Sequence, residues 1–216
     1  MINVEILEHP LVSHHLSIIR DRRTSADLFR NSIRKISEFL LMEATRNLPL
    51  RKTTLETPLS KMEVEIIDDS RTIFVSAVMR AGAIMLEAAA SLIPGAVLQH
   101  LGIYRDEETS RPVWYYNRLP AEFKKPEDTL LYICDPMLAT GGTATEAIKM
   151  YLKRGLKEKN ITFVCVIAAP EGVNKLSADF PNIKIRTAAV DEKLNNKNYI
   201  VPGLGDAGDR IFNTLY

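Results

Sequence analysis

The chain has 216 residues, 46% of them hydrophobic, which is enough to bury the core of one domain with small attachments. Lysine and arginine total 28 against 27 aspartate and glutamate, so no overall basic field favours nucleic acid and any anion site must be local. No stretch approaches the roughly 18 apolar residues of a membrane helix, and the N-terminus lacks the features of a secretion signal. We therefore expect a cytoplasmic protein with no membrane partner.

The first quarter of the chain predicts helices followed by a hairpin. Residues 10–47 carry apolar side chains at helical spacing, with a capping box at Thr24 and Asp27, and residues 1–50 form a helical N-terminal attachment. Residues 51–67 alternate and contain a proline, which predicts a short edge hairpin beside the main sheet.

Five apolar runs then predict buried strands, at residues 72–79, 96–104, 129–134, 161–168 and 184–190. Helical patterns follow the first, third and fourth runs. Strands that alternate with helices predict an α/β fold, a mostly parallel sheet flanked by helices on both faces.

The alternation breaks between residues 105 and 128, where a polar stretch precedes the β-prone residues 113–116. This pattern predicts a β-hairpin arm that projects from the sheet and packs over the site or against a second subunit.

Cys134 and Cys165 both lie in strand-like apolar runs, so we expect two reduced, buried thiols rather than a disulfide or a nucleophile. His9, His14 and His15 lack the spacing of a metal site and are interpreted as structural or exposed.

The most informative segment is the loop between the strand at 129–134 and the helical pattern after it, with the sequence DPMLATGGT at residues 135–143. Small residues let backbone N–H groups approach an anion, and a helix start adds further N–H groups and positive dipole charge. Asp135, at the carboxyl end of a parallel strand, would accept hydrogen bonds from sugar hydroxyls. The loop lacks the lysine of a Walker loop and the three glycines of a dinucleotide fingerprint. It therefore predicts a ribose phosphate site, the alternative being an ordinary strand-to-helix turn.

The same string resembles the phosphoribosyl-pyrophosphate (PRPP) loop of the type I phosphoribosyltransferases, in the form carried by the uracil phosphoribosyltransferases. Further strings resemble that family in its order, at residues 9–11, 20–21, 80–82, 102–106, 168–172, 191–195 and 199–210. The resemblance covers nearly the whole chain. It implies the type I phosphoribosyltransferase fold as one domain over residues 1–216, with a uracil-binding hood at 191–216.

The resemblance also implies the reaction of pyrimidine salvage, in which ribose 5-phosphate passes from PRPP to N1 of uracil to give UMP and diphosphate. Catalytic roles would fall on Arg80, Arg105, Asp135 and Asp206. The PRPP-binding residues would be Arg80, Arg105, Asp135, Pro136, Met137, Leu138, Ala139, Thr140, Gly141, Gly142, Thr143 and Asp206. The arginine forks suit the leaving diphosphate, whose charge must be neutralised.

Uracil would be read by Ile200, Gly205, Asp206 and Ala207, because glycine-rich backbone can present N–H and C=O groups to its two carbonyls and N–H. Relatives often carry two adjacent acids at the head of the PRPP loop, but here Cys134 precedes Asp135. Mg²⁺ would therefore enter mainly on the diphosphate and through water to Asp206. Family members form dimers or tetramers, some activated by GTP, so a homodimer or homotetramer is expected and GTP is a candidate allosteric activator.

Two alternatives stay open. One is a pyrimidine-responsive RNA-binding attenuation regulator on the same fold, which the near-neutral charge disfavours. The other is a phosphoribosyltransferase for a different base, such as adenine or hypoxanthine.

Overall fold

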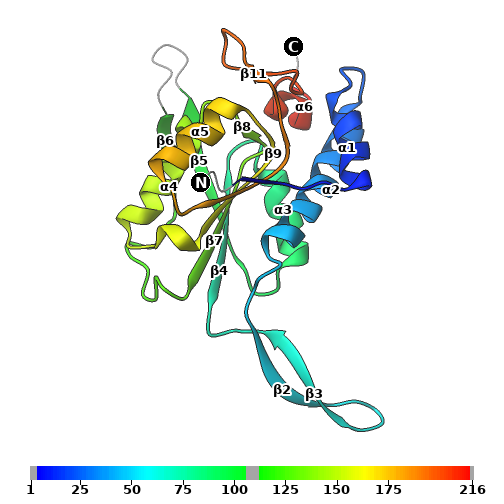
Figure 1. Cartoon of the computed structure of the whole chain (residues 1–216), viewed down its shortest axis with the longest axis vertical. Helices are drawn as coiled ribbons and strands as arrows, with labels where there is room; N and C mark the ends of the chain where they lie inside the picture. Colours follow the sequence, from blue (N-terminus) through cyan, green and yellow to red (C-terminus); the bar gives the residue numbers. More distant parts are fainter. Residues whose placement is uncertain (1–3, 106–111, 215–216) are drawn as a thin grey trace.

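A mostly parallel sheet forms the centre of the molecule (Figure 1). The computed structural model describes residues 4–105 and 112–214, and of Arg105 the backbone alone. Within them the sheet runs in the order β1-β10-β9-β7-β4-β5-β6, and a short strand β8 also pairs with β9. Its strands are β1 (Val4–Ile6), β4 (Thr72–Val78), β5 (Val97–Arg105), β6 (Pro112–Tyr116), β7 (Thr129–Cys134), β8 (Met137–Leu138), β9 (Ile161–Ala168) and β10 (Lys184–Val190).

All five predicted strands are confirmed, with ends that differ by no more than one residue. β9 shows why the apolar runs were informative, since every one of its residues is buried. A parallel strand covered on both faces needs apolar side chains at every position, not at every second one. Cys134 and Cys165 are free and buried in β7 and β9, and burial raises the pKa of the Cys165 thiol to about 12.

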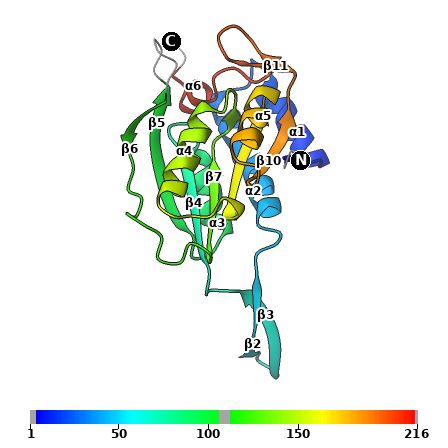
Figure 2. The ribbon, with the colours of Figure 1, turned by 60° about the vertical axis from the view of Figure 1, so that its left-hand side comes forward.

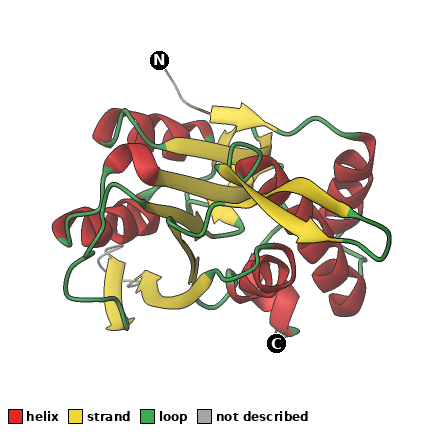
Figure 3. Cartoon of the chain, turned by 90° about the horizontal axis from the view of Figure 1, so that it is seen from below, coloured by secondary structure: helices red, strands yellow, loops and turns green. Residues whose placement is uncertain are grey.

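Helices cover both faces of this sheet (Figures 2 and 3). One apolar core lies under α1 (Pro10–Arg20), α2 (Ala26–Ala44), α3 (Ala83–Leu92) and α6 (Ala207–Phe212). A second core lies under α4 (Gly142–Lys153) and α5 (Pro170–Asp179). A single 3-10 turn, Glu158–Asn160, leads into β9. The predicted α/β class with flanking helices is thus confirmed.

The N-terminal helices start differently from the prediction. Ser25 caps α2, its side chain accepting the N–H of Leu28, and the predicted box at Thr24 and Asp27 does not form. The Thr24 hydroxyl instead donates to the Ile18 carbonyl at 2.6 Å, near the end of α1. A hydroxyl used to close the preceding helix is not available to open the next one.

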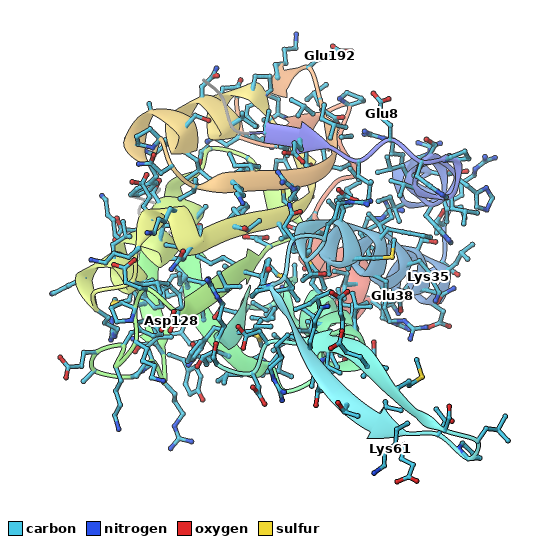
Figure 4. All side chains as sticks on the ribbon, turned by 60° about the horizontal axis from the view of Figure 1, so that its bottom comes forward. Glu8, Lys35, Glu38, Lys61, Asp128 and Glu192 are labelled. Carbon is cyan, nitrogen blue, oxygen red and sulfur yellow. The ribbon has the colours of Figure 1, made fainter. Side chains whose placement is uncertain are left out.

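A separate hairpin, β2 (Leu50–Glu56) and β3 (Lys61–Ile67), stands away from the body (Figure 1). The sequence placed it beside the main sheet, and that placement was wrong, because β2 and β3 pair only with each other. Lys61 lies out on this arm, far from the helices (Figure 4). The arm carries exposed apolar side chains, among them Leu59 at 95% exposure.

The hairpin predicted over residues 105–128 is built differently. β6 pairs antiparallel with β5 and becomes the edge strand of the main sheet, with a bulge between Gly102 and Ile103. Trp114 packs against the second core. Residues 106–111 lie outside the described part of the chain.

The C-terminal segment contains β11 (Lys193–Leu194), β12 (Ile200–Val201) and α6. β11 pairs antiparallel with β12 in a two-stranded sheet of its own. β11 and α6 lie at the opposite end of the body from the β2–β3 arm (Figure 1). This is the end at which β4 and β7 finish, so the segment overhangs the edge where an α/β sheet binds its ligands.

Candidate active site

The loop after β7 forms a small cradle. A cavity of about 110 Å³ is lined by Asp135, Met137, Leu138, Ala139, Thr140, Gly141, Gly142, Thr143 and Ala144. Gly141 has φ +76° and lies directly before α4, and no side chain caps that helix. The Gly142 N–H donates to the Thr140 hydroxyl oxygen in a long hydrogen bond of 3.4 Å, and the first turn of α4 otherwise offers its backbone N–H groups to an anion. This geometry supports an anion site over an ordinary turn.

Strand and helix contacts fix the shape of this loop. β8 pairs with the end of β9, Leu138 opposite Ala168, and the Ala169 N–H donates to the Leu138 carbonyl at 2.8 Å. On the other side, a Cβ at Gly172 of α5 would lie 2.5 Å from the Ala139 carbonyl oxygen. Only glycine lets α5 approach so closely. This explains a glycine that the sequence analysis quoted without a role.

Asp135 is the carboxylate that faces this cradle. Its Oδ1 accepts the N–H of Met137 at 3.2 Å. Burial raises the pKa of Asp135 to about 7, against the lowering effect of that hydrogen bond. A carboxyl with such a pKa changes charge near neutral pH, and a ligand rich in hydroxyl donors would favour its ionised form.

A larger cavity, about 260 Å³, opens from the cradle and shares Asp135, Met137 and Thr143 with it. Its other walls are Val78, Met79, Arg80 and Ala81 after β4, Ile103 on β5, and Asp206, Ala207 and Gly208. Segments more than 120 residues apart in the chain thus meet around one space.

Arg80 enters this cavity from a very tight turn. The Gly82 N–H donates to the Val78 carbonyl at 2.8 Å, and a Cβ on Gly82 would lie 2.5 Å from that oxygen. The guanidinium of Arg80 is 3.3 Å from the Asp209 carboxylate and 5.7 Å from the Phe212 ring centre. Its side chain is 56% exposed, so the ion pair contributes little and is readily exchanged for a bound anion.

Asp206 has a structural role as well as a place on the cavity wall. Its Oδ1 accepts the Asp209 N–H at 2.9 Å and so caps α6. Ala207 follows it, buried, on the same wall.

The structure brings together most, but not all, of the predicted site residues. Arg80, Asp135, Thr143, Asp206 and Ala207 line one cavity. Ile200 and Gly205 do not line either cavity; Ile200 is buried opposite Leu194. Arg105 is the last residue of β5, and its side chain lies outside the described part of the chain.

Sequence reasoning missed the residues that hold the C-terminal segment in place. Arg20 and Asp191 form a bidentate ion pair, at 2.8 and 2.6 Å, and both bind the backbone of Gly203. Both had been noticed within strings typical of the family, but a local pattern gives no sign that positions 171 residues apart meet.

In the described residues no group of three or more histidine, cysteine, aspartate or glutamate side chains could hold a metal ion. Across the same residues no helix combines the length and apolar character that a membrane span needs.

The parallel sheet, with its cradle and cavity at the carboxyl ends of β4 and β7, defines an α/β protein with a candidate anion-binding site at this edge. The family model described as "Uracil phosphoribosyltransferase" matches residues 6–214. A uracil phosphoribosyltransferase from Lactococcus lactis subsp. cremoris is 46% identical over 214 residues, 99% of this chain and 100% of that relative. One from Limosilactobacillus fermentum is 44% identical over 210 residues, 97% of this chain and 98% of that relative.

Among solved structures, the AQ2163 protein from Aquifex aeolicus is similar, with a TM-score of 0.88 and 35% identity over 97% of both chains. The chain belongs to the uracil phosphoribosyltransferase family. It is therefore an enzyme of the pentosyltransferase type.

Proposed function

We propose that the chain transfers ribose 5-phosphate from PRPP to N1 of uracil, and that the two joined cavities divide this substrate pair between them. The observation that carries the proposal is the shared wall of Asp135, Met137 and Thr143. A ligand that fills the cradle with a phosphate therefore extends past Asp135 toward Arg80 and Asp206. The family assignment favours this enzyme over the RNA-binding regulator and over enzymes for other bases.

In the proposed complex, the 5-phosphate occupies the cradle and receives the N–H groups of residues 140–144. Asp135 accepts hydrogen bonds from the ribose hydroxyls, and Arg80, with Arg105, binds the diphosphate. The bond from the anomeric carbon to the diphosphate breaks, and its electron pair leaves on the diphosphate oxygen. N1 of uracil bonds to that carbon, and its proton passes to water. Arg80 acts by neutralising the leaving group, for which its fork geometry is suited.

Uracil is proposed to lie against residues 200–207. Gly205 has φ +81°, a conformation suited to glycine, and backbone there can present N–H and C=O groups at close range. Cytosine would place an amino group against an N–H donor and leave that donor unpaired, which is the physical basis expected for its rejection.

Mg²⁺ is proposed to enter on the diphosphate. Among the described residues, Asp135 and Asp206 are the carboxylates that line the larger cavity, too few to hold the ion alone, so water and substrate oxygens complete its shell. Its charge would assist the departing diphosphate. Activation by GTP and assembly into a dimer or tetramer stay predictions from the family; mass in solution and rates with GTP test them.

The test of the PRPP assignment is Arg80→Ala. We expect kcat/KM for PRPP to fall by about 30- to 1000-fold, the loss of one donor to developing charge. Arg71→Ala is the matched control, because Arg71 precedes the other end of the same strand β4. UMP formation is followed with PRPP and a panel of bases. Normal kinetics in Arg80→Ala would remove Arg80 from the mechanism, and product from purines but not uracil would overturn the proposed substrate.

A further inference from the structure

We propose that Arg20 and Asp191 are positioning residues for uracil, which clamp Gly203 and so set the distance between the base-binding segment and the phosphate cradle. This inference rests on the proposed role of residues 200–207 in uracil binding. It assigns a part in the site to α1, which the sequence analysis described as part of a helical N-terminal attachment with no role in the site.

The clamp uses both polar groups of Gly203. The Gly203 N–H donates to Asp191 Oδ2 at 2.7 Å, and its carbonyl accepts Arg20 Nη1 at 2.9 Å. Arg20 and Asp191 bind each other through both carboxylate oxygens. The three residues therefore form a closed ring of charge-assisted hydrogen bonds, the strong kind.

The ring is buried enough to fix its members. The Asp191 side chain is 5% exposed and that of Arg20 is 28% exposed. Loss of either partner would leave a charge that water reaches poorly. Gly203 has φ +61°, and a Cβ there would lie 2.1 Å from the Ile200 carbonyl oxygen. The backbone conformation of this turn therefore requires glycine at position 203.

A short path of bonds connects this ring to the cradle. The Asp191 N–H donates to the Ala168 carbonyl at 2.8 Å, and Ala168 lies opposite Leu138 of the cradle strand β8. Leu138 lines the phosphate cradle, whereas Gly203 lies three residues before Asp206 on the larger cavity's wall. The end of β9 thus holds the phosphate side through β8 and the base side through Asp191.

Arg210 holds the same segment from the other direction. Its guanidinium donates to the carbonyls of Leu204 and Asp21, each at 2.7 Å, and packs over the Phe29 ring at 4.2 Å. Arg20, at the end of α1, thus donates to the C-terminal segment, and Arg210 of that segment donates to the end of α1. Arg20 binds the carbonyl of Gly203, and Arg210 binds the carbonyl of Leu204.

The variants Arg20→Gln and Asp191→Asn should raise KM for uracil by about 10- to 100-fold, since a misplacement of about 1 Å costs on the order of 100-fold. KM for PRPP should change far less, because the cradle keeps its own bonds to β9 and, of the proposed PRPP-binding residues, Asp206 alone lies in the displaced segment. Arg20→Lys keeps the charge without the fork and should recover part of the loss. Arg23→Gln is the matched control, since Arg23 lies in the same turn with its side chain 83% exposed.

Steady-state kinetics in both substrates decide the question, with melting temperatures for every variant. A rise in uracil KM that is much larger than the rise in PRPP KM, with partial recovery in Arg20→Lys, supports the proposal. Equal rises in both KM values, or a lower melting temperature with unchanged KM values, would assign the clamp to folding only. If Arg20→Gln does not fold, the same comparison of uracil KM with PRPP KM is made with Arg20→Lys.

Ala207→Val distinguishes failure of the positioning role from failure of the proposed uracil-binding segment. Ala207 lines the cavity and belongs to the proposed uracil segment. If Ala207→Val raises the uracil KM and the Arg20 and Asp191 variants do not, the clamp is wrong while the segment stands. If Ala207→Val also leaves the uracil KM unchanged, the assignment of the segment fails, and the positioning role fails with it.

Discussion

The larger cavity is lined by two kinds of segment, one that continues strands of the main sheet and one that lies outside the sheet. Residues 78–81 and 135–143 follow directly from strands β4 and β7 of the main sheet, whereas residues 206–208 follow a loop outside it. The sheet-borne side holds its shape with bonds within one turn or between neighbouring strands, such as those from the Gly82 N–H to the Val78 carbonyl and from the Ala169 N–H to the Leu138 carbonyl. The loop-borne side depends on bonds from Arg20 and Arg210 that join positions 183 and 189 residues apart.

This difference indicates a division of labour. A phosphate needs many N–H groups in a fixed array, and a strand, loop and helix in sequence supply that array locally. A base needs a few hydrogen-bonding groups at a fixed distance from the phosphate. The segment that binds the base must therefore be held in position by contacts with distant parts of the fold. Local structure suits the first task and long-range contacts suit the second.

The largest effect should come from the sheet-borne side, at Asp135. Its pKa of about 7 in the folded protein lies above the ordinary value, so between these two values the folded state binds the extra proton. The contribution of Asp135 to stability is therefore complete below its ordinary pKa and is lost as pH rises through about 7. In the part of the chain that the structure describes, Arg80 and Asp206 are the other charged side chains on the same cavity wall. We expect Asp135→Asn to raise the free energy of unfolding at pH 8 by about 2 to 4 kcal/mol and to weaken PRPP binding.

Urea unfolding of the original protein and Asp135→Asn at pH 8 and pH 5 checks this, with PRPP affinity measured in parallel. The stability gain should shrink toward pH 5. A gain of the same size at both pH values would show that the effect is one of packing, and a loss at pH 8 would show that the buried carboxylate is stabilised by contacts other than the Met137 N–H.

Sequence patterns predicted the sheet-borne side well. The buried strands are visible in the sequence as apolar runs. The segment DPMLATGGT lies between one of these strands and the next helix, so the order of elements along the chain predicted the positions of Asp135 and Thr143. The placement of Arg80 beside them followed from the family resemblance and from the parallel sheet, whose strands end at one edge.

The predictions that failed concern residues that compete for one role or that lie far apart in the sequence. Thr24 and Ser25 are both good capping residues, and which one caps α2 is decided by the Ile18 carbonyl that takes the Thr24 hydroxyl. The residues 51–67 have the alternation of a strand pair, but alternation does not say whether the pair joins a larger sheet. The ring of Arg20, Asp191 and Gly203 has no local signature at all.

A smaller effect is expected on the loop-borne side, from Gly203→Ala. The added Cβ would meet the Ile200 carbonyl oxygen, so residues 200–207 must shift, and the uracil KM should rise by about 10- to 100-fold with little change for PRPP. Gly95→Ala is the matched control, because Gly95 has a similar φ of +70° with open space around its Cβ position. Both variants should lose about 1 to 2 kcal/mol of stability from the left-handed backbone, and Gly203→Ala should lose more because its Cβ also meets the Ile200 carbonyl oxygen.

Only the Gly203 variant should lose affinity for uracil, as measured by steady-state kinetics. If Gly95→Ala shows the same loss, the effect comes from lower stability and not from the position of the loop. If Gly203→Ala weakens PRPP as much as uracil, the two sides of the cavity are not positioned separately.

The smallest effect should follow from Thr143→Val, at the point where the two cavities meet. Thr143 lines both of them, but the cradle gives a phosphate several backbone N–H groups that the substitution leaves in place. Removal of one neutral hydroxyl donor should cost about 0.5 to 1.5 kcal/mol in PRPP binding, a rise in KM of about 2- to 10-fold. Thr54→Val, on the exposed face of the projecting hairpin, is the control. The uracil KM should not change, because the base side is held through Ala168 and Asp191 and not through this hydroxyl. A parallel rise in both KM values would instead place the reacting centre, where N1 of uracil meets the anomeric carbon of PRPP, against Thr143.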